Sequence, residues 1–327
     1  MTSSPTAAPH PRDGAALACL VAGALAIALG PILVRLSDLH PVATAFYRLV
    51  IALPFFWAGL HAERRAGVRP VTGREAALMV LAGAMLAGDL ALWHLSITMT
   101  SVANATLFNN CAPVFVALFG WLLFRERVSG GLVAALAVAL AGMGLLIGGN
   151  AVPDGAAGAA AGTAAGTGGD WRGDALAIST GAFYAVYLMV LTRLRQSLST
   201  TRIMAGTTAA AAVLLLGAAV AEGGPLVPAG LHGWGVVLAL GIVCHVVGQS
   251  LITSALAHLP VTFSSIGLLV QPVGAAALAW VLLGEPLGTV QWLGGGLALA
   301  GITLARRATA RPTDTGQKDV AEGHASR

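Results

Sequence analysis

The chain has 327 residues, of which 57% are hydrophobic and only 10% are charged, with a formal net charge of +4. A soluble domain usually carries about 25% charged residues, so this composition excludes an ordinary water-soluble globular protein. It predicts an integral membrane protein in which lipid surrounds much of the surface.

Ten apolar runs are long enough to cross a bilayer, whose core is about 30 Å thick and needs roughly 20 helical residues. In chain order they lie near residues 15–36, 42–61, 74–95, 101–124, 129–148, 172–192, 203–221, 233–257, 262–283 and 288–305. Short connections such as "SDLHP" and "GEPLG" separate them. The sequence therefore predicts an all-α integral membrane protein with ten transmembrane helices.

Three segments fall outside these runs. Residues 1–13 and 306–327 are polar and predicted to be disordered, and the Gly/Ala-rich segment 149–170 is predicted to be a flexible linker. The linker separates two units of five helices, residues 14–148 and 171–305. The first run also fits a signal peptide, but its length and Arg35 near its far end favour a membrane span.

The positive charges are distributed unevenly between the two sides of this predicted bundle. With the N-terminus placed in the cytoplasm, all of the 18 lysines and arginines except Arg35, Arg48 and Arg172 fall on the cytoplasmic side. Cytoplasmic connections of membrane proteins are enriched in lysine and arginine. We therefore expect both termini to be cytoplasmic, in a multi-pass protein of the inner membrane.

The two five-helix units resemble each other in sequence. Four distinctive residues recur at one offset of 159 positions (272 minus 113): Pro113 and Pro272, Trp121 and Trp280, Glu126 and Glu285, Gly142 and Gly301. Because five is odd, the second unit must enter the membrane upside down relative to the first. Inverted repeats around a midplane site are typical of transporters that alternate between inward-open and outward-open states.

Three stretches give the chain a resemblance to a known family. They are the two repeat ends, "RERVSGGLVAALAVALAGMGLLI" and "GEPLGTVQWLGGGLALAGITLA", and the early segment "RLSDLHPVATAFYRLVIALPF". Together they resemble the EamA family of the drug/metabolite transporter superfamily over about residues 15–305. The resemblance implies a secondary transporter that exports amino acids or other small metabolites or drugs. Arg48 in "YRLV" matches an arginine that such proteins often carry early in the second helix.

Ionisable side chains inside the membrane are the first candidates for function, because burying a charge in lipid costs about 2.5–3.5 kcal/mol even on a lenient scale. Asp89 is either a site for a proton or a substrate amine, or the partner of Arg48 in a structural ion pair. His245 and Gln249 share one helix face, and we expect them to line a cavity. The alternative for His245 is a core histidine that a backbone carbonyl satisfies.

Amides and prolines stand at matching places in the two repeats. The segment "NATLFNNCAP" contains Asn109 and Asn110 just before Pro113, and "SSIGLLVQP" contains Gln271 just before Pro272. We predict that these amides line a shared polar cavity and that the prolines bend their helices.

Two tyrosines complete the predicted substrate site. Tyr184 and Tyr187 lie one turn apart and either stack on the substrate or pack in the core. With them, the predicted site consists of Asp89, Asn109, Asn110, Tyr184, Tyr187, His245, Gln249 and Gln271.

Other function classes lack their sequence signatures. There is no HExxH, GxSxG or P-loop motif, and the three cysteines form no CxxC pair. The sequence thus predicts no catalytic residue, no metal site, no cofactor and no nucleic-acid partner. An intramembrane enzyme or a channel for a small apolar substrate remains the alternative. The expected partners are a small-molecule substrate and the lipid bilayer, in a monomer or a homodimer.

Overall fold

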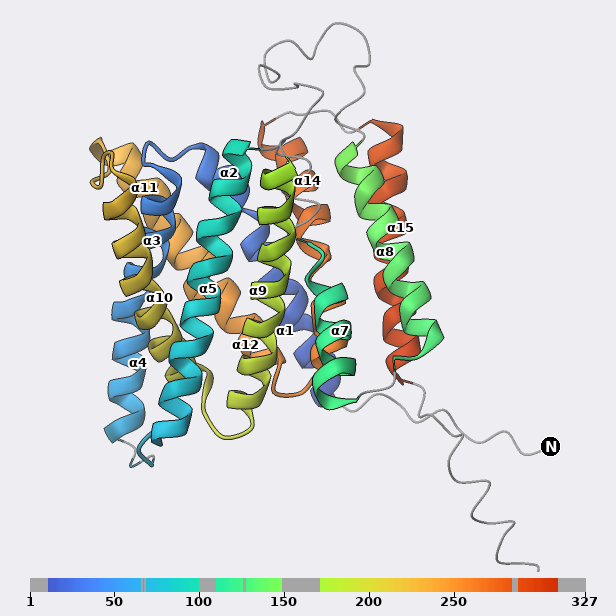
Figure 1. Ribbon diagram of the computed structural model, residues 1–327, viewed down its shortest axis with the longest axis horizontal. Coiled ribbons are helices and arrows are strands. Elements are labelled where there is room, and N and C mark those ends of the chain that lie inside the picture. The colour runs from blue at the N-terminus through green and yellow to red at the C-terminus, as the bar shows by residue number, and fades with distance from the viewer. Residues whose placement is uncertain are drawn as a thin grey trace, which may run out of the picture.

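The computed structural model describes residues 11–65, 67, 69–99, 110–125, 128–148, 171–283 and 288–310 (Figure 1). Within these residues the chain forms helices and no strands. Asn109, Glu126, Glu285 and the predicted linker 149–170 lie outside the described residues. α1 begins at Pro11 and α15 extends to Ala310, a few residues beyond the runs that the sequence predicts.

Several of the described helices are joined by connections of only a few residues. In order they are α1 (Pro11–Ala28), α2 (Gly30–Arg35), α3 (Pro41–Val50), α4 (Leu53–Arg65), α5 (Gly73–Met99), α7 (Ala112–Phe124), α8 (Gly130–Gly148), α9 (Trp171–Arg195), α10 (Thr200–Glu222), α11 (Gly230–Ala239), the π-helix η2 (Leu240–Gln249), α12 (Ser250–Ala255), α13 (Val261–Gly267), α14 (Val270–Leu283) and α15 (Thr289–Ala310).

Seven helical segments among the described residues are long and apolar enough to cross a membrane. They are 14–34, 41–65, 73–93, 171–195, 200–222, 230–255 and 261–278, and each coincides with a predicted run. α7, α8 and α15 coincide with the other three predicted runs. The chain is therefore a multi-pass, all-helical membrane protein, and the number of ten spans stays a prediction.

Four predicted runs are not single helices, which corrects the sequence analysis. α1 and α2 share one run, as do α3 and α4, and α13 and α14, while α11, η2 and α12 share another. Pro31, Pro54 and Pro272 each lie in the first turn after a break. A proline fits there because the first residues of a helix need no N–H donor for the helix ladder.

Local hydrogen bonds close these breaks tightly. The amide of Ala52 donates to the carbonyl of Leu49 at 3.1 Å, and that of Gln271 to the carbonyl of Leu268 at 2.9 Å. Each bond spans three residues and satisfies backbone groups that lipid could not satisfy. The breaks are therefore hydrogen-bonded turns rather than frayed helix ends.

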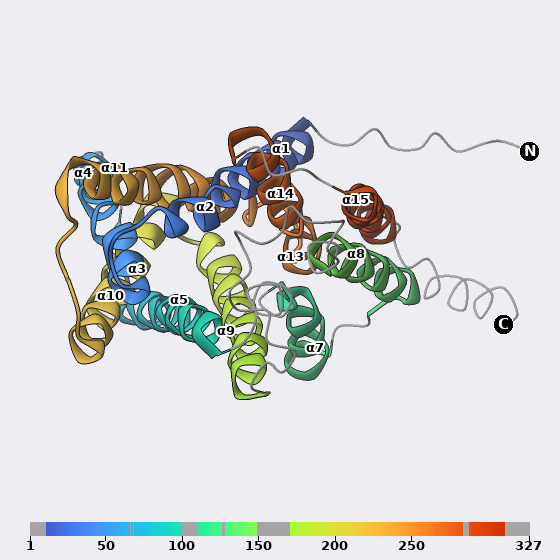
Figure 2. The ribbon, with the colours of Figure 1, turned by 90° about the horizontal axis from the view of Figure 1, so that it is seen from above.

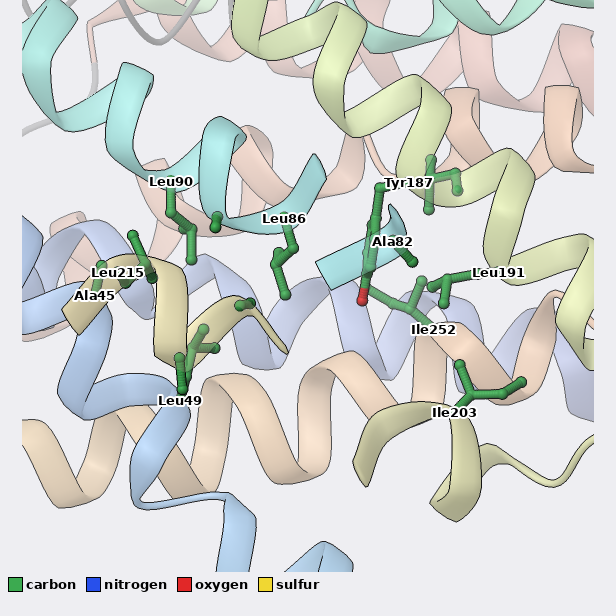
Figure 3. Close-up of a cluster of buried hydrophobic side chains, with 14 of the residues drawn as sticks. Ala45, Leu49, Ala82, Leu86, Leu90, Tyr187, Leu191, Ile203, Leu215 and Ile252 are labelled. Atoms are coloured by element: carbon green, nitrogen blue, oxygen red, sulfur yellow. The ribbon is translucent and has the colours of Figure 1, made fainter. Parts of the chain in front are cut away.

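The largest core lies between α3, α5, α9, α10 and α12. Leu49, Leu86, Leu191, Ile203 and Ile252 belong to it, and all of them are buried (Figure 3). A glycine on α1 also permits a close approach to η2, because a Cβ on Gly23 would lie 2.7 Å from the carbonyl oxygen of Gly248. These contacts hold α1, α3 and α5 in fixed positions around the middle of the bundle.

α8 and α15 form a pair at one side of the bundle (Figures 1 and 2). Small residues bring the two helices together: a Cβ on Gly142 would overlap the backbone at Ala298, and one on Gly301 would overlap Ala139. Close approach through small residues is the usual way in which helices associate in lipid. Gly144, two residues further along α8, faces open space.

This contact predicts that Gly142→Ala destabilises the protein. The added methyl would push α15 away, and such overpacking typically costs about 1–3 kcal/mol. Thermal unfolding of the detergent-purified protein measures the loss as a lower melting temperature. Gly144→Ala is the matched control and should change stability by less than about 1 kcal/mol. Equal melting temperatures for the two variants would contradict this packing.

Candidate functional site

A cavity of about 150 Å³ lies at the centre of the bundle. Its walls come from the end of α1, α2, α3, α5, the start of α7, α9, η2 and the break between α13 and α14. The residues that α2, α3 and α5 contribute belong to the halves of their spans at the end of the bundle where α2 lies, uppermost in Figure 1. The cavity therefore extends from the middle of the bundle toward that end.

Many of the predicted functional residues meet at this cavity. The residues that line it include Arg48, Asp89, Asn110, Pro113, Tyr184, Gln249, Gln271 and Pro272. Residues from both predicted repeats thus share one wall. The rest of the lining is mostly apolar, as is usual for small-molecule sites.

Asp89 is the buried acid of the cavity. Its side chain lies on α5 and is only 8% exposed. Within the described part of the chain, its Oδ1 has no hydrogen-bond partner. α5 is fixed against α9 at this level, because a Cβ on the neighbouring Gly88 would lie 2.5 Å from the ring of Phe183. A buried, unpartnered carboxylate is costly, so it points to a role in binding a ligand or a proton.

Arg48 is the cation of the same cavity. It lies on α3, is half-buried, and its Nε has no hydrogen-bond partner among the described residues. Arg48 and Asp89 both belong to the described part of the chain, and they form no direct ion pair there. The two groups nevertheless interact electrostatically, so the structural pair that the sequence left open stays an alternative.

Tyr187 and His245 lie elsewhere, which corrects their predicted place. Tyr187 is fully buried in the core, where its hydroxyl accepts a 3.2 Å hydrogen bond from Nε2 of Gln249. His245 is 1% exposed, and its Nε2 lies 2.8 Å from the hydroxyl of Thr208. The side chain of Thr208, rather than the backbone carbonyl considered above, satisfies this histidine. Of the pair on η2, only Gln249 reaches the cavity.

Two of the lining residues that the sequence analysis missed stand one turn from its charged candidates. Thr44 lies one helical turn before Arg48, and Trp93 lies one turn after Asp89. Residues four apart share a helix face, so this spacing could have predicted both once the charged residues were chosen.

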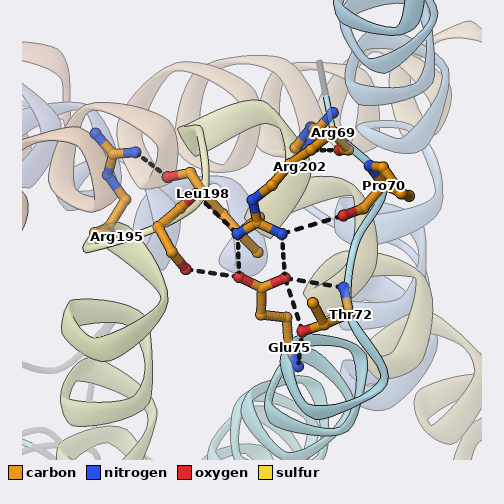
Figure 4. A network of polar contacts seen from close by, with 8 residues as sticks. Arg69, Pro70, Thr72, Glu75, Arg195, Leu198 and Arg202 are labelled. Atoms are coloured by element: carbon orange, nitrogen blue, oxygen red, sulfur yellow. Dashed lines mark hydrogen bonds and ion pairs between the residues drawn. The ribbon is translucent and has the colours of Figure 1, made fainter. Parts of the chain in front are cut away.

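At the opposite end of the bundle lies a network of polar contacts, which we call the lower clamp (Figure 4). Its centre is Glu75 at the start of α5, which accepts hydrogen bonds from Arg69 at 2.9 and 2.5 Å and from the hydroxyl of Ser197 at 2.7 Å. Thr72 caps α5 and binds the same carboxylate, as in a capping box. The hydrogen bond to Glu75 raises the pKa of Arg69 further above its ordinary value.

A second branch of the lower clamp reaches α10. Nε of Arg202 lies 3.1 Å from Glu63 at the end of α4, and its guanidinium also donates to the backbone carbonyl of Arg69 at 2.6 Å. Ser199 caps α10 and donates to Glu63 at 2.7 Å. The lower clamp therefore fastens the α4–α5 connection to the α9–α10 connection, which lie far apart in the sequence.

Comparisons with known proteins are consistent with this architecture. A model of the EamA-like transporter family matches residues 14–148 and 171–307. An uncharacterized transporter of Archaeoglobus fulgidus is 24% identical over 281 residues, covering 83% of this chain and 89% of the relative. A probable terminal-alkyne amino-acid exporter of Streptantibioticus cattleyicolor is 27% identical over 253 residues, covering 74% and 77%. A solved crystal structure with 20% identity shares the fold, with a TM-score of 0.72 over 90% of this chain and 99% of that one.

The lower clamp predicts that Glu75→Gln loosens the connection that contains Arg69. A neutral amide cannot hold the guanidinium as the carboxylate does, so the loop opens more often. Trypsin spares the Arg69–Pro70 bond because proline follows the arginine, but it should then cut after Arg65, where this connection begins, faster by roughly two- to fivefold, the range expected for an exposed charge network. Glu222→Gln, which removes a carboxylate near His40 at the other end of the bundle, should leave this rate unchanged. Equal cleavage rates in the Glu75→Gln and native proteins would refute the fastening role.

Proposed function

The chain belongs to the EamA-like transporter family, and from this premise we propose that it exports a small amino acid or a similar metabolite by proton-coupled alternating access. As a family member it is a membrane transporter. The observation that carries the finer proposal is the central cavity, where Oδ1 of Asp89 and Nε of Arg48 are buried without a hydrogen-bond partner among the described residues.

Two inverted repeats would supply the conformational change. We assign the first repeat to residues 14–148, the second to 171–305 and the linker to 149–170, with five spans in each repeat. The separate matches of the family model to 14–148 and 171–307 support this division. Polar residues from both repeats line the cavity, as expected for a site between two pseudo-symmetric halves.

The distribution of arginines supports one orientation of the protein in the membrane. Arg64, Arg69, Arg193, Arg202 and Arg307 all lie at the end of the bundle that holds the lower clamp. The positive-inside rule assigns this end to the cytoplasm, so both termini would be cytoplasmic in the inner membrane. The cavity then lies toward the outside, and the lower clamp must separate before a substrate enters from the cytoplasm.

Asp89 provides a means of coupling. A single buried carboxylate is stabilised either by a proton or by a cationic group of the substrate, because each neutralises the same charge. Substrate would be released outside as a proton binds, and the proton would be released inside as substrate binds. The inward proton gradient then drives export.

The name of one relative agrees with this cargo. The protein of Streptantibioticus cattleyicolor is described as a probable exporter of a terminal-alkyne amino acid. Its likeness to the present chain favours amino acids among the small metabolites that would fit the cavity.

Asp89→Asn tests the proposal. The amide keeps the shape of the carboxylate but carries neither a proton nor a charge, so proton-driven export should fall to background. Secreted and retained metabolites of cells that overproduce each protein are compared by untargeted mass spectrometry, with and without a protonophore. The native protein should enrich one compound class outside the cell, and the protonophore should abolish this enrichment.

The controls separate function from folding. Asp38→Asn replaces a carboxylate outside the cavity, where Asp38 accepts a hydrogen bond from the amide of Ala229, and it should export normally. Membrane abundance of each variant is measured in parallel. Undiminished, protonophore-sensitive export by Asp89→Asn would show that coupling lies elsewhere.

A further inference from the structure

One contact of the lower clamp has a counterpart at the opposite end of the bundle. In the lower clamp, the hydroxyl of Ser199 donates to Oε2 of Glu63 at 2.7 Å. At the other end, Nδ1 of His40 lies 2.7 Å from Oε2 of Glu222. Glu222 follows Glu63 by 159 positions (222 minus 63). Ser199 follows His40 by the same 159 positions (199 minus 40), which is the offset between the two predicted repeats.

The four residues also occupy equivalent places on their helices. His40 is the N-cap of α3, and Ser199 is the N-cap of α10. Glu63 lies in the last turn of α4, and Glu222 is the last residue of α10. The span formed by α3 and α4 packs along α10, so one contact joins these two antiparallel spans at each end.

The two contacts respond differently to pH. At the lower end, a serine hydroxyl and the guanidinium of Arg202 bind Glu63, and neither donor titrates near neutral pH. Histidine, in contrast, is the side chain whose charge ordinarily changes between about pH 5 and 8. Nδ1 of His40 makes no hydrogen bond among the described residues, so its short approach to a carboxylate is favourable only when the imidazole is positively charged.

Glu222 is the acid that faces His40, because no other described acid lies within ion-pair distance of it. Asp38, two residues earlier, instead accepts a hydrogen bond from the amide of Ala229, just before α11. The other described side chains with a charge or an imidazole on the neighbouring parts of α3, α5, η2 and α11 are Arg48 and Asp89 at the cavity, His245 beside Thr208, and the exposed His232.

We propose that His40 and Glu222 form a proton-dependent latch, the outer latch, which holds α3 to α10 when the imidazole is protonated and releases them when it is neutral. The inference rests on the proposed function, which assigns this end to the outside of the cell. Thr44 lines the cavity and donates to the backbone carbonyl of His40 at 3.2 Å, so the outer latch adjoins the proposed substrate site. An acidic exterior would therefore favour closure of the outer end, the step that follows substrate release.

Electron paramagnetic resonance of spin-labelled, purified protein tests the outer latch. The labels are attached at Leu36→Cys and Val220→Cys, two exposed positions near its partners, after the three native cysteines are replaced by alanine. Between about pH 5.5 and about pH 8.5, the population with the short label-to-label distance should fall by roughly two- to fivefold, the range expected for a partly exposed ion pair.

A second label pair reports on the equivalent contact of the lower clamp. Labels at Ala62→Cys and Gln196→Cys, both exposed, should keep the same distance at both pH values, because the donors there do not titrate. An unchanged distance at the outer pair, or a longer distance at both pairs, would overturn the inference.

Three variants separate the outer latch from a general effect of pH. His40→Gln supplies an amide donor that does not titrate, so the outer distance should be the same at both pH values. Glu222→Gln removes the acid, so the outer distance should be long at both. His232→Gln replaces an exposed imidazole on α11 and should keep the native response. A pH response that persists in His40→Gln would assign the titration to another group and refute the outer latch.

The distance measurement uses no substrate, so its outcome is separable from that of the proposed function. A pH-dependent outer distance in a protein that exports nothing would support the outer latch and count against export. A pH-independent outer distance in an active exporter would refute the outer latch and leave the transporter proposal standing.

Discussion

Hydrocarbon cannot form hydrogen bonds with a peptide group, so every backbone N–H and C=O of a membrane span needs a partner within the protein. This constraint explains why the helix breaks lie where they do. The interruption between α3 and α4 and that between α13 and α14 are closed by bonds over three residues, with a proline in the turn that follows. The second of these breaks lines the cavity, where protein rather than lipid surrounds the chain. The chain thus departs from regular helix beside the space through which a substrate would pass.

Charged side chains have hydrogen-bond partners at the lower end of the bundle but lack them in the cavity. At the lower end, Glu75 and Arg202 satisfy their polar atoms by bonding to connections that come from both halves of the chain. In the cavity, Arg48 and Asp89 keep polar atoms that no described residue satisfies. A satisfied network stabilises one conformation, whereas unsatisfied groups favour a ligand that completes them. The satisfied polar contacts and the unsatisfied polar atoms therefore belong to different residues at different levels of the bundle.

The charged residues allowed part of the cavity lining to be predicted from the sequence. The direction in which each helix face points could not be predicted. Arg48 and Asp89 could be chosen because charged residues are rare in apolar runs, and both line the cavity. The sequence could not show that Tyr184 lines the cavity while Tyr187 packs in the core. The two tyrosines are only three residues apart, and because most of the surface of α9 is apolar, the pattern does not reveal which face of the helix meets the cavity. The breaks were missed because a proline inside an apolar run permits either a bend or a new helix. The lower clamp was also missed, although Thr72 and Glu75 have the spacing of a capping box.

The contact between Gly142 and α15 has a consequence for the synthesis of the protein. α8 ends at Gly148, and its partner begins at Thr289, so 140 residues (149 to 288) separate the two helices along the chain. At roughly 5–20 residues per second, the ribosome needs on the order of ten seconds to make this stretch. During that time the glycine-containing face of α8 lacks the surface that it is shaped to meet. The packing surface of α8 is therefore complete only after α15 has been synthesised, and the rate of translation sets the length of this interval.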